Sequence, residues 1–366
     1  MEAIAVAGAL AAKPGNGGEA WVRLAWVLGL RRLGLDAWLL EEVERDTAGG
    51  RAFFERSVAA AGLDSRALLL VAGEAEGRRQ AAELADEAVA LVNISGNLRD
   101  PDLLQRFARV AYVDLDPGFT QIWHAQGQLG DQLSRHDRHF TVGLNLGAAD
   151  CEIPTAGFEW VPLPPPVLLA EWTPSEREFD RFTTVATWRN ALGPPQHAGR
   201  AFTLKHHQLR RFAELPQRSG LPFEIALDVH PAEAEEAERL RRLGWSVVEP
   251  SAVAADPAAF RDYVRGSGAE FSVAQGIYAE TRSGWISDRS AHYLATGRPA
   301  VVQETGLPPA YRPEAGLLTF SDPAQAADAV AAVVADHERH RDAARAYAEA
   351  TFDSDRVLTQ MLEALG

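Results

Sequence analysis

The chain has a single cysteine, Cys151, among its 366 residues. One cysteine excludes an internal disulfide bond and fits a reducing compartment, so we expect a cytoplasmic protein. A lone cysteine is also more often an inert side chain than a nucleophile, and we assign it no catalytic role. The first six residues, Met1 to Val6, lack the basic residues that open a secretion signal, and none is predicted.

Positive charge is scarce as well. Thirty-six Lys and Arg residues stand against 51 Asp and Glu residues, which leaves a formal net charge of −15. Binding to a nucleic-acid backbone depends on a basic surface, so we expect no nucleic-acid partner. The chain also lacks any apolar run of about 18 to 20 residues, the length that spans a bilayer, and no integral membrane segment is predicted.

Lysine occurs only twice, at Lys13 and Lys205, and arginine supplies all other strong positive charge. Both lysines stand where the pattern of elements could place a phosphate. At 366 residues, with 46% hydrophobic and 24% charged residues, the composition is that of a globular protein long enough for two domains.

The hydrophobic pattern alternates strands with helices. An apolar strand over 3–9 is followed by a Gly-rich turn, a helix over 19–33 and a second strand over 36–40. Continuous apolar runs over 88–94 and 109–114 are typical of strands buried on both faces. A second alternating series begins at Phe182, and this repetition favours parallel sheets covered by helices.

Clustered prolines between Trp160 and Pro166 mark a stiff connector between the two series. We therefore predict an α/β protein with two Rossmann-like, doubly wound domains facing a cleft. The expected division is 1–165 for the first domain, 166–182 for a linker, 183–345 for the second domain and 346–366 for a C-terminal helix. Ligands bind such sheets at the carboxyl ends of their strands.

The turn after the first strand, Lys13 to Gly18, is the first candidate binding loop. Its glycines, Gly17 and Gly18 among them, allow close approach of the backbone to a ligand, and the following helix N-terminus favours an anion. The glycine spacing is neither that of a dinucleotide fingerprint nor that of a P-loop, which argues against a nicotinamide dehydrogenase. The alternative is a plain Gly-rich turn.

Cations and a second turn suggest a phosphate site in the second half. Arg189 follows a predicted strand, and Lys205 opens the next helix, so both could neutralise a diphosphate. Residues 282–289 form a Gly/Ser turn that leads into a helix opening at Ser287 or Asp288, where unpaired N–H groups and the helix dipole suit an anion. Each cation could instead be a solvated surface charge, and Asp288 a plain N-cap.

These turns resemble those of glycosyltransferases of the GT-B type. Residues Arg282-Ser-Gly-Trp-Ile-Ser287 are similar to the His-Cys-Gly-Trp-Asn-Ser loop of the plant-type signature, and Gly297-Arg-Pro299 with the strand after it resembles the nucleotide-sugar half of that fold. The resemblance implies that 1–165 bind the acceptor, that 183–345 bind a nucleotide diphosphate sugar and that the C-terminal helix packs back toward the first domain. Together with the cations Arg189 and Lys205, the residues expected to hold the nucleotide sugar are Arg282, Ser283, Gly284, Trp285, Ser287, Asp288 and Arg289.

The sequence departs from that signature at two positions. The signature His is Arg282 here, and the signature Glu, which binds the ribose hydroxyls, falls on His292, with Asp288 as the other candidate. Glu280 and Asp288 also form a Glu-x7-Asp pair similar to the Glu-x7-Glu of a retaining family. Whether the anomeric centre is inverted or retained stays open.

Acidic and histidine side chains follow the buried strand that ends at Asp114. An inverting transferase needs a general base near the acceptor hydroxyl, commonly Asp or His. Asp116 and His124 are the first candidates, and Asp137 and His136 are the others. The cluster has neither a His-x3-His pair nor paired cysteines, and no metal site is predicted.

These observations predict a metal-independent glycosyltransferase that moves a sugar from a nucleotide diphosphate sugar, its co-substrate, to a hydroxyl of a small-molecule or glycan acceptor. No further cofactor is expected. A nucleotide-sugar epimerase or hydrolase on the same fold, and a non-enzymatic sugar- or nucleotide-binding protein, are the alternatives.

Overall fold

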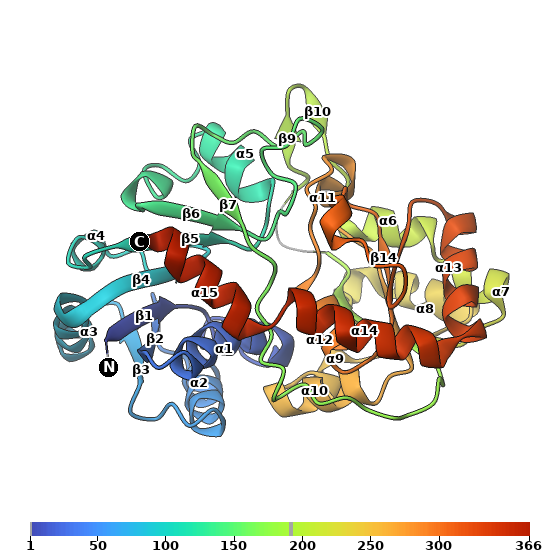
Figure 1. The fold of residues 1–366 in the computed structure, drawn as a ribbon, viewed down its shortest axis with the longest axis horizontal. Coiled ribbons are helices and arrows are strands. Elements are labelled where there is room, and N and C mark those ends of the chain that lie inside the picture. Colours follow the sequence, from blue (N-terminus) through green and yellow to red (C-terminus); the bar gives the residue numbers. More distant parts are fainter. Residues whose placement is uncertain (1, 190–192) are drawn as a thin grey trace.

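The computed structural model describes residues 2–189 and 193–366, which form two α/β domains side by side (Figure 1). Each domain is built on one parallel sheet, with seven strands in the first and six in the second. This confirms the predicted fold class. No helix of the described residues is long and apolar enough to cross a membrane.

The first sheet has the strand order β3-β2-β1-β4-β5-β6-β7, with every pairing parallel. Its strands are β1 (Ala3–Ala7), β2 (Asp36–Val43), β3 (Ala67–Val71), β4 (Ala88–Ile94), β5 (Val110–Asp114), β6 (Arg138–Thr141) and β7 (Trp160–Pro162). The helices of this domain are α1 (Gly17–Arg32), α2 (Ala48–Ala60), α3 (Ala75–Glu87), α4 (Pro101–Leu104) and α5 (Phe119–Ala125).

The second sheet repeats this winding, with the order β12-β11-β8-β13-β14-β15. Its strands are β8 (Phe182–Thr187), β11 (Phe223–Asp228), β12 (Trp245–Val248), β13 (Ala269–Ser272), β14 (Ala300–Gln303) and β15 (Leu317–Phe320). A short hairpin, β9 (Gln196–His197) and β10 (Arg200–Ala201), precedes its helices. These are α6 (Lys205–Arg211), α7 (Leu215–Ser219), α8 (Ala234–Arg242), α9 (Pro250–Val253), α10 (Pro257–Arg265), α11 (Gly276–Glu280), α12 (Asp288–Ala295), α13 (Pro323–Ala335) and α14 (His337–Thr351).

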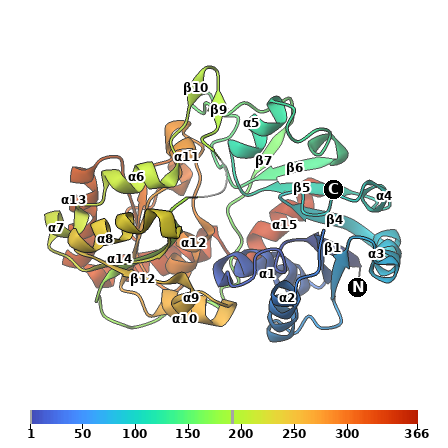
Figure 2. The same ribbon diagram turned by 180° about the vertical axis from the view of Figure 1, so that it is seen from behind.

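The strand order of each sheet places a binding crevice at a defined point. The order reverses between β1 and β4 in the first sheet and between β8 and β13 in the second. Loops that leave the carboxyl ends of these neighbouring strands diverge to opposite faces, which opens a crevice there. Between the domains, α1 of the first lies against α10 of the second, and α10 in turn contacts α12 (Figure 2).

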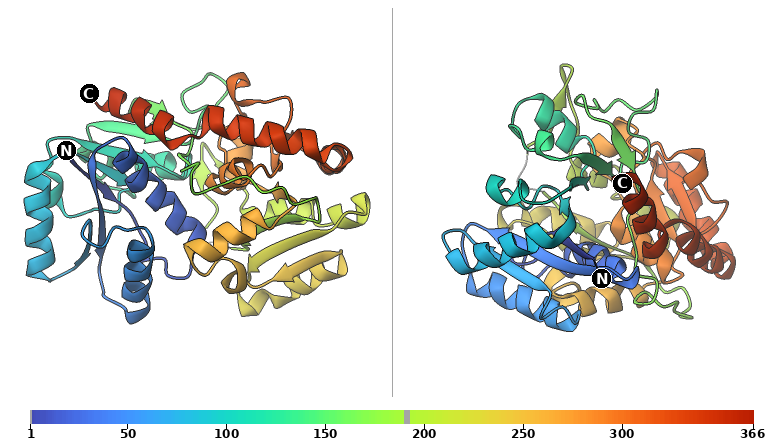
Figure 3. Two further views of the ribbon diagram at one scale, coloured as in Figure 1. Left: turned by 60° about the horizontal axis from the view of Figure 1, so that its bottom comes forward. Right: turned by 60° about the vertical axis from the view of Figure 1, so that its left-hand side comes forward.

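The last helix, α15 (Ser354–Leu365), leaves the second domain and packs against α1 of the first (Figures 1 and 3). The two helices approach so closely at Gly29 that a side-chain carbon there would overlap Leu358. Arg32 adds a two-fold ion pair to Asp355, with both N–O distances 3.0 Å. Before α15 begins, the chain pairs with Val167, whose N–H donates to the carbonyl of Phe352.

The contact at Gly29 generates a stability prediction. In Gly29→Val the added methyl groups would force α15 away from α1, and we expect the free energy of unfolding to fall by about 1 to 3 kcal/mol. Gly49→Val is the matched control, because Gly49 lies in α2 with open space around it. Urea unfolding of both variants measures the effect, and equal stability of the two would contradict the close packing.

Candidate functional site

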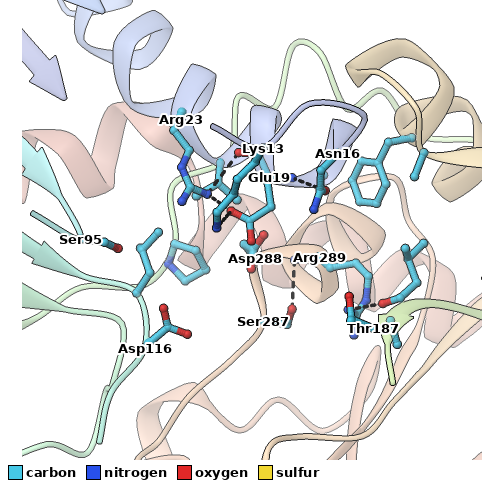
Figure 4. A pocket seen from close by; sticks show the side chains of 18 of the residues that line it. Lys13, Asn16, Glu19, Arg23, Ser95, Asp116, Thr187, Ser287, Asp288 and Arg289 are labelled. Atoms are coloured by element: carbon cyan, nitrogen blue, oxygen red, sulfur yellow. Dashed lines mark hydrogen bonds and ion pairs between the residues drawn. The ribbon is translucent and has the colours of Figure 1, made fainter. Parts of the chain in front are cut away.

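A cleft of about 860 Å³ lies between the two domains. It is lined by loops that follow the strands near the two crevices, together with the N-terminal turns of α1 and α12 (Figure 4). The polar residues that line it are Lys13, Asn16, Glu19, Arg23, Ser95, Asn97, Asp116, Thr187, Lys205, Asp228, Glu249, Ser251, Gln275, Tyr278, Ser287, Asp288 and Arg289. Of the residues predicted from sequence, the cleft brings together Gly18, Asp116, Lys205, Trp285, Ser287, Asp288 and Arg289.

The N-terminus of α12 forms the centre of the second domain's wall. Ser287 is its N-cap and accepts a hydrogen bond from the N–H of Arg289 at 3.2 Å, and Asp288 is the first helical residue. The remaining N–H groups of the first turn have no partner within the helix, and the helix dipole places partial positive charge at the same point. This end of α12 can therefore receive an anion.

Lys205 brings a cation to the same wall. It is the first residue of α6, and its backbone N–H donates to Gln275 at 2.7 Å, which fixes the start of the helix. Within residues 2–189 and 193–366 its ammonium forms no ion pair. Burial and the nearby Arg289 cation lower its pKa to about 8. A bound anion beside Lys205 would stabilise its charged form and raise its pKa again.

Arg289 also lines the cleft, and three of its five N–H donors are engaged within the protein. Its guanidinium donates to Glu270 at 2.6 Å, to the carbonyl of Val185 at 2.8 Å and to the hydroxyl of Ser272 at 2.7 Å. These bonds tie the start of α12 to β8 and β13. Arg289 therefore contributes positive charge and rigidity to the wall, whereas Lys205 contributes a free donor.

The opposite wall carries a charged triad from the first domain, made of Lys13, Glu19 and Arg23. Lys13 Nζ lies 3.1 Å from Glu19 Oε2, and Arg23 contacts the same oxygen. Although burial opposes it, these two cations lower the pKa of Glu19 to about 2. Asp288 faces the triad from α12 (Figure 4), and burial together with the Glu19 charge raises its pKa to about 6.

Asp116 lies on the loop that follows β5. The buried carboxylate of Asp114 shapes this loop, because it accepts hydrogen bonds from the hydroxyls of Thr120 and Thr141, from the amide of Gln121 and from the N–H of Asp116. The Asp116 side chain is open to the cleft, yet protein atoms surround it, and this burial raises its pKa. Of the general-base candidates predicted from sequence, Asp116 is the one that lines the cleft.

The other base candidates lie elsewhere, which differs from the sequence expectation. His124 turns its ring to Phe158, with 5.2 Å between ring centroids, and His136 is buried with its Nδ1 2.8 Å from the carbonyl of Gln132. Asp137 bonds to the backbone N–H of Val110 at 2.7 Å, at the amino end of β5. That end of the sheet is opposite the cleft, so Asp137 cannot meet a ligand held there.

Residues 282–284 were expected to hold phosphate, but the structure places them in a junction between the domains. We call this junction the seam; it consists of 143–145 and 281–285. Asn145 donates its N–H to the carbonyl of Ser283 at 3.0 Å and its side-chain amide to that of Arg282 at 2.9 Å. Arg282 pairs with Asp150, and Gly284 takes a positive φ of 72° against Asn145. Only the later part of the turn, from Trp285, reaches the cleft.

Contact between the domains also explains why the first Gly-rich loop has glycine at 17 and 18. Gly17 donates its N–H to the carbonyl of Ala254 at 2.8 Å, and a side chain at this position would overlap the backbone of Asp256. Gly18 faces the ring of Phe260, which is 3.3 Å from where a side-chain carbon would stand. These glycines let α1 approach α10, and the loop lines the cleft with the side chains of Lys13 and Asn16 and with Gly18.

Two further candidates differ from expectation. His292 stacks on Trp172 with 4.1 Å between ring centroids, and burial lowers its pKa to about 3, so it is a neutral core residue rather than a ribose ligand. Arg189 is exposed and bonds to Glu233 at 2.8 Å. Neither is among the residues that line the cleft.

Several cleft residues were not predicted from sequence. Ser95 and Asn97 follow β4, Thr187 and Asp228 end β8 and β11, and Tyr278 lies on α11. Most of these follow the carboxyl end of a predicted strand, and that position was the available signal. Within the part of the chain that the structure describes, no three His, Cys, Asp or Glu side chains are grouped to hold a metal ion.

The low pKa of Lys205 can be measured directly because the chain has only two lysines. In Lys13→Met, an ε-¹³C-lysine spectrum contains the signal of Lys205 alone. We expect it to titrate with a midpoint near pH 8, since burial and Arg289 disfavour the charged form. A midpoint near 10.5, the ordinary lysine value, would contradict a buried Lys205 ammonium beside Arg289.

No protein-family model and no curated protein sequence matches the chain. Solved structures do match it along its whole length. An alpha-glucosyltransferase in complex with UDP is 11% identical with a TM-score of 0.66, and the match covers 100% of both chains. HepE of Anabaena in complex with UDP-glucose is 12% identical with a TM-score of 0.62, covering 100% of this chain and 99% of that one.

A third similar structure is the sucrose-phosphate synthase of Thermosynechococcus elongatus, 12% identical with a TM-score of 0.55, covering 100% of this chain and 98% of that chain. At these identities the likeness concerns the fold. The chain has the GT-B fold, as the sequence resemblance predicted.

Proposed function

We propose that the protein is a glycosyltransferase that moves a sugar from a nucleotide diphosphate sugar to an acceptor hydroxyl. One observation carries this proposal. The α12 N-terminus and Lys205 form a wall of the cleft that can receive an anion, and the open carboxylate of Asp116 lies in the same cleft on the first domain. The fold adds support, because similar structures were solved with UDP or UDP-glucose.

In this proposal the donor binds to the second domain. Its diphosphate lies at the N-terminus of α12, where Lys205 donates to a phosphate oxygen and Arg289 adds charge. As the bond to the sugar breaks, negative charge grows on the departing diphosphate, and this wall stabilises it. Because the helix dipole and cationic side chains supply that stabilisation, the proposed reaction is metal-independent.

The acceptor, a small molecule or glycan, enters against the first domain, beside Lys13, Ser95 and Asn97. Asp116 accepts the proton of the attacking hydroxyl, and burial favours this role because it raises the carboxyl pKa toward neutral pH. This assignment describes an inverting reaction. Holding both substrates in one closed cleft makes their encounter effectively intramolecular.

Asp116 also distinguishes the alternatives. An epimerase or hydrolase on this fold would turn over the donor without an acceptor, and a binding protein would close on a ligand without forming product. A carboxylate open to the cleft and opposite an anion site favours the transferase. We further propose that the enzyme is bacterial and, because its single cysteine fits a reducing compartment, cytoplasmic. We also propose that it binds no nucleic acid, since the chain carries a net charge of −15. One of the similar alpha-glucosyltransferase structures contains a 13-mer DNA.

Lys205→Met tests the donor site. Loss of a charge-assisted bond of about 1.5 to 3 kcal/mol should weaken UDP binding about 10- to 100-fold, measured by titration calorimetry. Arg189→Met is the matched control and should leave the affinity unchanged, because Arg189 pairs with Glu233 outside the cleft. Unchanged affinity in Lys205→Met would contradict the donor site, and loss in Arg189→Met would restore the sequence expectation for that residue.

The affinity for UDP should also depend on pH. Above pH 8 the free protein loses the proton of Lys205, so binding should weaken as the pH rises from 8 to 10. Lys205→Arg keeps its charge throughout this range and should show a flatter profile. Identical profiles for the two proteins would mean that Lys205 does not contact the diphosphate.

A further inference from the structure

Tyr278 joins the two domains at the inner end of the cleft. It lies on α11 of the second domain, and its hydroxyl donates to Asp116 Oδ1 of the first domain at 2.8 Å. The tyrosine is only 3% exposed. The contact therefore exists only while the two domains keep this separation.

Packing across the domain boundary fixes the ring of Tyr278. It meets the edge of Phe119 of α5 at 6.1 Å between centroids and lies 4.5 Å from the ring of Trp285. The preceding residue, Ile277, fills the space beside Gly118, where a side-chain carbon would come within 2.8 Å of it. The position of the hydroxyl thus follows from the fit of α11 against α5.

The two domains control different parts of Asp116. Its backbone is held by the first domain, since its N–H donates to Asp114 at 3.0 Å. Its carboxylate, among the residues that the structure describes, accepts a side-chain hydrogen bond from Tyr278 alone. The orientation of the carboxylate is therefore determined by the second domain.

We propose that Tyr278 is a positioning residue that orients Asp116 across the cleft, so that the base is set for the acceptor hydroxyl only when the domains are closed. This inference rests on the proposed function, in which Asp116 takes the acceptor proton. It adds that the same domain closure that encloses the donor also orients the Asp116 carboxylate. Attack by water in the open state is thereby disfavoured, because the carboxylate then lacks its orienting partner.

The sign of the expected pH effect follows from the hydrogen bond. A hydroxyl that donates to a carboxylate favours the charged form, so it lowers the carboxyl pKa, and its removal raises that pKa. Burial and Glu19 raise the pKa of Asp116, whereas Tyr278, Lys13 and Arg23 lower it. The other ionisable groups that face this contact are Asp114 from β5, Lys205 from α6 and Asp288 from α12.

The test is a titration of the Asp116 carboxyl carbon by ¹³C NMR, with the signal assigned by its absence in Asp116→Asn. In Tyr278→Phe we expect the pKa of Asp116 to rise by about half to one pH unit, the effect of one lost hydrogen bond. Tyr347→Phe is the matched control, because its hydroxyl bonds to the carbonyl of Tyr311 at 2.8 Å, away from the cleft. An unchanged midpoint in Tyr278→Phe, or an equal rise in Tyr347→Phe, overturns the proposal.

A second variant tests the dependence on closure. Gly284→Ala places a side chain against Asn145 at the seam and should separate the domains, which breaks the bond between Tyr278 and Asp116. In this background the further change Tyr278→Phe should leave the pKa of Asp116 where Gly284→Ala alone sets it. A rise in the double variant over Gly284→Ala as large as that of Tyr278→Phe over wild type overturns the coupling to closure.

The titration is independent of the donor. If wild-type protein fails to bind UDP, the proposed function fails, while the pKa difference between wild type and Tyr278→Phe still decides whether Tyr278 orients Asp116. If UDP binds and the pKa difference is absent, the donor site stands and the positioning role fails.

Discussion

The close approach of the two domains at the seam is the constraint on which the rest of the structure depends. Gly284 has a positive φ and leaves no room for a side chain against Asn145, while Gly17 allows the same closeness between α1 and the start of α10. Residues with a Cβ at these points would push the domains apart. The cleft, the triad facing Asp288 and the bond between Tyr278 and Asp116 all require this separation.

Most cations that line the cleft are already paired with carboxylates of the protein. Arg289 is paired with Glu270 and donates to two further acceptors, and Arg23 and Lys13 share Glu19. Lys205 has no ion-pair partner among the described residues, and burial and the Arg289 cation lower its pKa to about 8. A chain with net charge −15 can in this way still present a local site for an anion.

Much of the architecture could be predicted from sequence because buried parallel strands leave a direct signal. Residues 88–94 were expected as a strand and form β4 with those bounds, and the strand expected over 109–114 forms β5 from Val110 to Asp114. The strand β3 was not predicted; it lies at the edge of the sheet and is only half-buried. The helix expected over 19–33 begins earlier, at Gly17 of α1, because Asn16 is its N-cap and accepts a hydrogen bond from the N–H of Glu19.

The site was harder to predict, for a physical reason. A glycine beside a helix N-terminus has the same sequence signal whether it makes room for a phosphate or for another domain. Gly17 and Gly284 serve the second purpose here, and only the three-dimensional arrangement of 143–145 and 254–257 shows it. Asp116 and Lys205 were accessible to sequence reasoning because both follow from strand and helix ends, whereas the pairing of Asp116 with Tyr278, 162 residues apart, was not.

The crossing of α15 onto α1 has a consequence for biosynthesis. The apolar face of α1 that surrounds Gly29 is covered by a helix that leaves the ribosome after the whole second domain. The first domain therefore cannot complete its core while the second is being made, and its α1 face stays open to chaperones during that interval. Assembly of the two domains and completion of the first are the same late step in folding.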